Sequence, residues 1–115
     1  MTVAFQLCTE LLFTEAAWEI GRRGAQLIAA PRATSEHRRW RMAACLAAIM
    51  SGCFVASANR RSYDSEAFAG RSWLVSPEGD ILLETTADSP FLTADVDLTA
   101  ADRAKQTYPR NIPIP

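Results

Sequence analysis

The thiol of Cys8 is the group in this sequence that is best placed to do covalent chemistry. Cys8 follows the apolar run 3–7, which is typical of a short buried strand, and precedes a stretch with helical signals. Nucleophiles of α/β proteins collect where parallel strands end, and backbone N–H groups and cations there can favour a thiolate. The other interpretation is that Cys8 fills space in the core, because cysteine is among the most buried residue types. Its position alone leaves both interpretations open.

His37, the only histidine, offers a second arrangement for thiol chemistry. A Cys8–His37 dyad would resemble that of a thiol protease. His37 lies, however, in the arginine-rich segment 37–41 (HRRWR), which is typical of a solvent-facing helix start. The same segment could be taken as a basic patch for nucleic acid, although charges beside a helix start usually face solvent.

The other candidate residues suggest little chemistry. Cys45 and Cys53 share one face of a predicted helix and are interpreted as packing residues. Asp95 and Asp97 alternate on the exposed face of a predicted strand, and no third ligand accompanies them to make a metal site. Three cysteines without a C-x-x-C pair indicate neither a disulfide framework nor a zinc site.

The composition narrows the class of protein. The chain has 115 residues, 49% of them apolar and 22% charged, which fits one globular domain rather than a disordered segment. The net charge of −1 predicts no general attraction to nucleic acid or to an anionic membrane. No apolar run approaches the ~20 residues of a membrane span, and the first residues lack the basic segment of a secretory signal. We therefore expect a cytoplasmic location, where thiols stay reduced.

The first third of the chain predicts a strand–helix–strand unit. Residues 3–7 are the first strand, and residues 14–25 are a helix with Thr14 as N-cap and Gly24 as the left-handed residue at its end. Residues 26–31 are a second buried strand. Such a unit pairs its strands in parallel through a right-handed crossover.

The remaining segments predict one long helix and several strands. We expect a helix over 35–53, a strand over 54–59, a polar loop over 60–70, a hairpin over 71–86, a strand over 92–98 and an irregular tail from 108. Residues 42–50 contain no charge, so the long helix is apolar nearly all round. A helix of that kind is covered on both sides, and a partner subunit is the simplest cover.

Taken together, the segments resemble the carbon–nitrogen hydrolase (nitrilase) superfamily, specifically the C-terminal half of its domain. The resemblance covers nearly the whole chain, and its motifs fall in the family's order. They are LCTELLFTE with Cys8, Glu10, Phe13 and Glu15; GRRGAQLIAAP with Gly24, Ala25 and Pro31; RMAACLAAIMSGCFVASANR with Asn59; FAGRSWLVSPEGDIL with Phe68, Gly70, Ser72, Pro77 and Gly79; and FLTADVDL followed by YPR.

The resemblance implies an α/β fold that is half of a four-layer α-β-β-α sandwich, a mixed sheet with two main helices on one face. It implies that Cys8 is the nucleophile of a Glu-Lys-Cys triad and that the backbone N–H of Thr9 is an oxyanion donor. The substrate would be a small amide, carbamoyl compound or nitrile, with no metal or organic cofactor. The helices over 14–24 and 36–52 would form the interface of a homo-oligomer.

The sequence departs from the family in one large respect, because the family's catalytic Glu and Lys precede the cysteine. The residues before Cys8 include neither, and Lys105, the only lysine, has no catalytic role by resemblance. We therefore expect residues 1–115 to be the C-terminal part of one domain, either truncated or completed by a separate polypeptide, and inactive alone. The alternatives are a non-catalytic dimerisation or interaction domain and, more remotely, a thiol hydrolase using Cys8 and His37. The sequence does not distinguish an amidase from a nitrilase.

Overall fold

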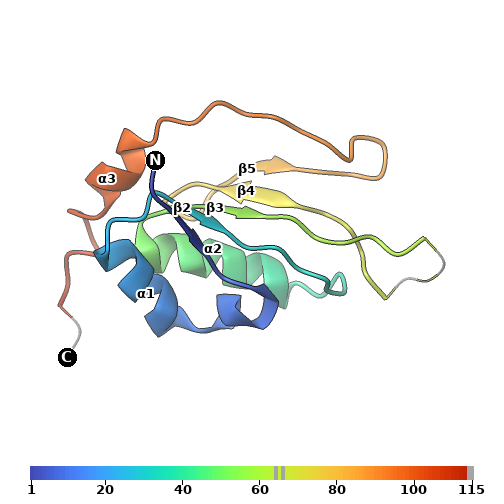
Figure 1. The fold of residues 1–115 in the computed structure, drawn as a ribbon, viewed down its shortest axis with the longest axis horizontal. Coiled ribbons are helices and arrows are strands. Elements are labelled where there is room, and N and C mark those ends of the chain that lie inside the picture. The colour runs from blue at the N-terminus through green and yellow to red at the C-terminus, as the bar shows by residue number, and fades with distance from the viewer. Residues whose placement is uncertain (64, 66, 114–115) are drawn as a thin grey trace.

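One five-stranded sheet, with two helices packed on one of its faces, forms the body of the molecule (Figure 1). The computed structural model describes residues 1–63, 65 and 67–113. In chain order the elements are β1 (Val3–Phe5), the 3-10 helix η1 (Cys8–Leu12), α1 (Thr14–Arg22), β2 (Leu27–Ala29), α2 (Arg39–Ser51), β3 (Phe54–Ser57), β4 (Trp73–Val75), β5 (Ile81–Glu84) and α3 (Thr99–Ala104).

The sheet is mixed, with the strands in chain order across it. β1, β2 and β3 are parallel, with Val3 opposite Leu27 and Leu27 opposite Phe54, whereas β4 and β5 continue the sheet in antiparallel fashion. The predicted strand–helix–strand unit is therefore confirmed, as are the mixed sheet and its two main helices. The strands are shorter than expected, although backbone hydrogen bonds continue the pairing of β1, β2 and β3 beyond their last residues.

The core lies between the sheet and α2, and small side chains let the two approach closely. Alanines 43, 44, 47 and 48 are buried on α2 against Ile28, Val55 and Val75 of the sheet. At the crossing of α1 and α2, Gly21 touches the backbone of Ser51, and a Cβ built on Gly21 would lie 2.0 Å from the Ser51 carbonyl oxygen. Only glycine fits at this crossing.

The ends of α1 differ in how well the sequence predicted them. Gly24 has φ +86° just after the helix, as expected for a left-handed terminating residue. The N-cap prediction was wrong, since Phe13 holds that position without a side-chain cap and Thr14 is the first helical residue. The cause is η1, which leads directly into α1 and closes with a hydrogen bond from Phe13 N–H to the Glu10 carbonyl at 3.0 Å.

The predicted strand over 92–98 does not form. Residues 91–97 run extended but pair with no strand, and they return on the side of the sheet away from α1 and α2 (Figure 1). Leu92 and Ala94 border a cavity over Ala56 and Leu74 of the sheet, so the alternating pattern reflects partial contact with this face rather than ladder pairing.

Helix α3 was not predicted. The Asp97 carboxylate accepts hydrogen bonds from the Thr99 N–H at 3.0 Å and the Thr99 hydroxyl at 2.6 Å, which supports the start of this short helix. Gln26 donates to Asp102 at 3.1 Å and thereby fixes α3 beside the start of β2.

The predicted hairpin is confirmed, with Gly79 at φ +87° in the turn between β4 and β5.

None of the described helices has both the length and the apolar character that a membrane span requires.

Candidate active site

Cys8 lies just beyond the carboxyl end of β1, at the first residue of η1. Its backbone has φ +52°, a left-handed conformation that is uncommon for a residue with a Cβ and costs about 1–3 kcal/mol. The Cys8 N–H donates to the Pro31 carbonyl at 3.0 Å, which holds this turn against the end of β2. The expected position at the end of a strand is confirmed, and Cys45 within α2 and Cys53 just after it are placed as predicted.

Two polar side chains brace the turn around Cys8. Gln6 is buried and donates to the Glu10 carbonyl at 3.1 Å. The Glu10 carboxylate accepts a 2.6 Å hydrogen bond from the Leu7 N–H, so it supports the backbone of the turn. Sequence reasoning included Glu10 in a motif but missed Gln6, whose signal was an amide within an otherwise apolar run.

The backbone N–H of Thr9 is the expected oxyanion donor. Within the described residues no acceptor bonds to it, although the neighbouring Cys8 and Glu10 N–H groups are both engaged. Thr9 is an exposed residue. A donor without an acceptor beside a cysteine is one of the features that an acyl-transfer site needs.

A buried cation, which sequence reasoning missed, lies beside this turn. Arg32 follows Pro31 and is only 5% exposed. Its guanidinium donates to the Ser57 hydroxyl at 2.5 Å and the Arg71 carbonyl at 2.7 Å, and lies 4.0 Å from the centre of the Trp73 ring. Burial lowers the pKa of Arg32 from 12.5 to about 10, and the nearby Cys8 acts in the opposite direction. Arg32 therefore stays protonated at neutral pH.

The alternation along β2 contained the signal for Arg32. Ile28 and Ala30 are completely buried against the helices, and two residues further along Arg32 is on the same side. This alternation predicts that the Arg32 guanidinium is buried. The charge of Arg32 and its position after Pro31 at a strand end would not predict this by themselves.

Asn59, Ser72 and Gly70, which belong to the family motifs, stabilise loops near the carboxyl ends of the parallel strands. Asn59 accepts from the Thr34 N–H at 2.9 Å and donates to the Thr34 carbonyl at 3.1 Å, while the Ser72 hydroxyl accepts from the Asn59 N–H at 3.0 Å. Gly70 is buried with φ +75°, which favours glycine. Glu15 is exposed in the first turn of α1.

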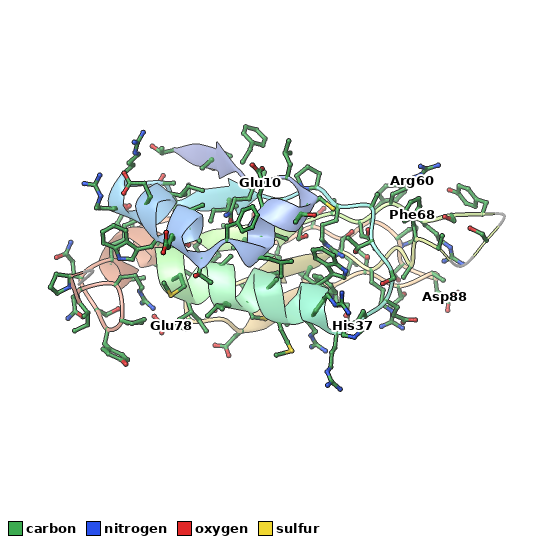
Figure 2. The ribbon with its side chains drawn as sticks, turned by 90° about the horizontal axis from the view of Figure 1, so that it is seen from below. Glu10, His37, Arg60, Phe68, Glu78 and Asp88 are labelled. Atoms are coloured by element: carbon green, nitrogen blue, oxygen red, sulfur yellow. The ribbon has the colours of Figure 1, made fainter. Side chains whose placement is uncertain are left out.

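His37 is not brought to Cys8. Figure 2 shows His37 at the start of α2, away from Glu10 in the turn of the cysteine. Its Nδ1 accepts from the backbone N–H of Arg39 at 3.1 Å and from the Arg39 side chain at 3.2 Å. Among the described residues no hydrogen bond joins His37 to Cys8.

The match of residues 2–106 to the family model described as carbon-nitrogen hydrolase decides the family. The chain belongs to the carbon–nitrogen hydrolase family. The omega-amidase NIT2 of Mus musculus is 27% identical over an alignment of 112 residues, which covers 93% of this chain and 41% of the relative. The chain thus spans less than half the length of this relative.

Solved structures agree with the fold. The carbon-nitrogen hydrolase from Helicobacter pylori G27 superposes with a TM-score of 0.79 over 95% of this chain and 44% of its own, at 18% identity. A mutant of the amidase from Nesterenkonia sp. AN1, which carries a covalent acetamide adduct on its active site cysteine, has a TM-score of 0.65 and 27% identity over 71% of this chain and 32% of its own.

The one lysine of this carbon–nitrogen hydrolase chain lies far from Cys8. Lys105 donates to the carbonyls of Gly52 at 3.1 Å and Ala101 at 3.2 Å, where β3 begins. Cys8 follows the carboxyl end of β1, whereas Gly52 precedes the amino end of β3. Because β1 and β3 are parallel, Cys8 and Lys105 lie at opposite ends of the strands. Lys105 therefore cannot act on the Cys8 thiol in this fold. It lies 3.9 Å from Cys53, and burial, the larger influence, raises the pKa of the Cys53 thiol.

No cluster of three or more His, Cys, Asp or Glu side chains suited to a metal ion occurs in the part of the chain that the structure describes.

Proposed function

We propose that this chain supplies the nucleophile of a thiol hydrolase that cleaves a non-peptide amide, carbamoyl or nitrile carbon–nitrogen bond. The observation that carries the proposal is Cys8 itself, held at φ +52° at a strand end beside the unengaged Thr9 N–H. The covalent adduct on the active site cysteine of the Nesterenkonia amidase supports the same role for a cysteine in a related fold.

For an amide, the Cys8 thiolate adds to the carbonyl carbon, and the Thr9 N–H donates to the oxyanion that forms. The C–N bond then breaks, and the nitrogen leaves as ammonia or an amine after gaining a proton. The resulting thioester reacts with water, which releases the carboxylic acid and returns the thiol. A nitrile would reach the same thioester after one further addition of water.

The base and the cationic group that this chemistry needs would come from sequence outside these 115 residues. We propose that residues 1–115 are the C-terminal part of the domain and that the rest packs on the open face of the sheet. Phe5 is 68% exposed there, beside the partly exposed Leu27 and Ala29 of β2. Large exposed apolar surfaces are unusual on monomeric proteins, so this face is expected to be covered.

A second candidate function is a non-catalytic dimerisation or interaction domain. The observation that favours it is on α2, where Met42 is 63% exposed and Leu46, one turn later, is 44% exposed. We propose a homo-oligomer formed through helices 14–24 and 36–52, which is compatible with either function. Three free cysteines suit a cytoplasmic location.

The test is to combine the chain with an N-terminal half from a related amidase and to measure ammonia release from small amides. Activity should appear only in the combined protein, and Cys8→Ala should abolish it whereas Cys45→Ala, which also removes a thiol, should leave it. Hydrolysis by the 115-residue chain alone that is lost in His37→Ala would instead support a Cys8–His37 dyad. A combined protein that assembles without activity would favour the interaction domain.

A further inference from the structure

A cavity that Cys8 does not line lies where the β2–α2 connection meets the start of α2, the start of β4 and the end of β5. Its volume is about 190 Å³. Arginines dominate its charged lining, which consists of Arg32, Arg38, Arg41, Arg71, Glu36 and Glu84.

The two carboxylates of this cavity are already engaged by one arginine. Arg71 lies 3.3 Å from the Glu36 carboxylate and 3.9 Å from that of Glu84. Glu84 also accepts a 2.7 Å hydrogen bond from the Trp73 ring N–H. Among the described residues no carboxylate pairs with Arg32, Arg38 or Arg41, so the cavity has an excess of positive charge.

Arg32 is the deepest of these cations. A guanidinium has five N–H donors, and three of those of Arg32 are engaged, by Ser57, by Thr34 at 2.8 Å and by the Arg71 carbonyl. One donor on each terminal nitrogen has no acceptor in the described part of the chain. A buried charge without a counter-charge is costly, and an anion in the cavity would offset this cost.

We propose that this cavity binds the carboxylate of a small organic acid. Arginine forks match the planar carboxylate group, to which they can donate two parallel hydrogen bonds. Ligand pockets for drug-sized molecules are about 300–1,000 Å³, so this smaller cavity suits an acid of a few carbons. Glu36 and Glu84 in the wall oppose a doubly charged phosphate more strongly than a singly charged carboxylate group.

This binding does not depend on the chemistry proposed for Cys8. The two features share the carboxyl edge of the parallel strands, yet the cavity is complete without the thiol. Cys8→Ala is therefore expected to leave carboxylate binding unchanged.

The experiment titrates the purified chain with succinate and follows tryptophan fluorescence, for which Trp73 in the cavity wall is the probe, and binding heat. Succinate should bind saturably, and the neutral diamide succinamide should bind at least about tenfold more weakly, since a charged hydrogen bond contributes about 1.5–3 kcal/mol. Arg38→Gln and Arg41→Gln, both at exposed residues that should still fold, should each weaken succinate binding about tenfold.

The matched control is Arg39→Gln, which removes the same charge from the same turn of α2 at a residue that does not line the cavity. It should change the affinity less than about twofold. Equal losses in all three variants would mean diffuse attraction and would overturn the site. Equal affinity for succinamide, tighter binding of inorganic phosphate than of succinate, or no saturable binding up to about 10 mM would also overturn the proposal.

Discussion

Cys8 and Pro31 are joined by a 3.0 Å hydrogen bond from the Cys8 N–H to the Pro31 carbonyl. This contact continues the pairing of β1 and β2 beyond the last residues of both strands. It fixes the backbone of Cys8 while the chain turns into η1, so the thiol is presented by a rigid edge rather than by a free loop. Rigid support of this kind is what a nucleophile needs for a defined line of attack.

The positive φ of Cys8 predicts an unusual order of stabilities. Glycine adopts φ +52° without the strain that a Cβ introduces, so Cys8→Gly should be more stable than Cys8→Ala by about 1 kcal/mol. Urea denaturation of the two variants measures the difference. A Cys8→Ala protein at least as stable as Cys8→Gly would show that the residue does not hold this conformation in solution.

The crossing of α1 and α2 predicts a large effect at Gly21. A Cβ there would collide with the Ser51 carbonyl oxygen, so Gly21→Ala should lower the free energy of unfolding by about 3 kcal/mol. Gly24→Ala serves as the control, because a Cβ at Gly24 meets no atom within 4 Å and only its positive φ is strained, at a cost of about 1 kcal/mol. Similar losses in both variants by urea denaturation would contradict this packing.

Glu19 should contribute to the loss of folding stability at low pH. Hydrogen bonds from Arg22 and Arg23 lower the pKa of its carboxyl from 4.5 to about 2. Since the folded-state pKa is the lower one, the contribution is present above pH 4.5 and is lost as the pH falls towards 2. Thermal melts from pH 2 to 6 should therefore fall less steeply for Glu19→Gln than for the unchanged protein. Glu15→Gln, at an exposed residue of the same helix, is the control. Salt should reduce the effect of Glu19, because its ion pairs with Arg22 and Arg23 are partly exposed.

The proposed interface on α2 predicts an oligomer that charge can disrupt. Leu46→Glu would place a carboxylate in the middle of the apolar surface formed with Met42, and should convert the assembly to a monomer in sedimentation velocity at micromolar concentration. Phe91→Glu, which changes an exposed apolar residue outside the helices, is the control and should leave the assembly intact. A monomeric unchanged protein would refute the interface.

The sequence predicted the parallel unit well because local signals agree with the tertiary packing there. Apolar residues in 3–7 and 26–31, with Gly24 between them, define two buried strands and a helix end, and the position of Cys8 follows from them. The family motifs were recognisable for the same reason, since they coincide with strand ends and turns.

Two of the errors arise from contacts that sequence spacing does not contain. The segment 92–98 has the alternation of a strand, but no neighbouring strand offers it a ladder. Arg32 was not singled out from the sequence, because Ser57 and Trp73, which surround its guanidinium, come from other strands. Long-range partners of this kind decide whether a polar group is buried.

The most direct test of the central claim is to find which sulfur reacts. The chain, completed by an N-terminal half, is treated with fluoroacetamide and analysed by peptide mass spectrometry. Attack by the thiolate on the CH2 carbon displaces fluoride and leaves an acetamide group on sulfur. The account predicts one adduct, on Cys8, formed faster than on Cys45 or Cys53, because burial raises the pKa of both other thiols. Labelling of Cys45 or Cys53 at the same rate as Cys8, or an unlabelled Cys8 in an active protein, would contradict it.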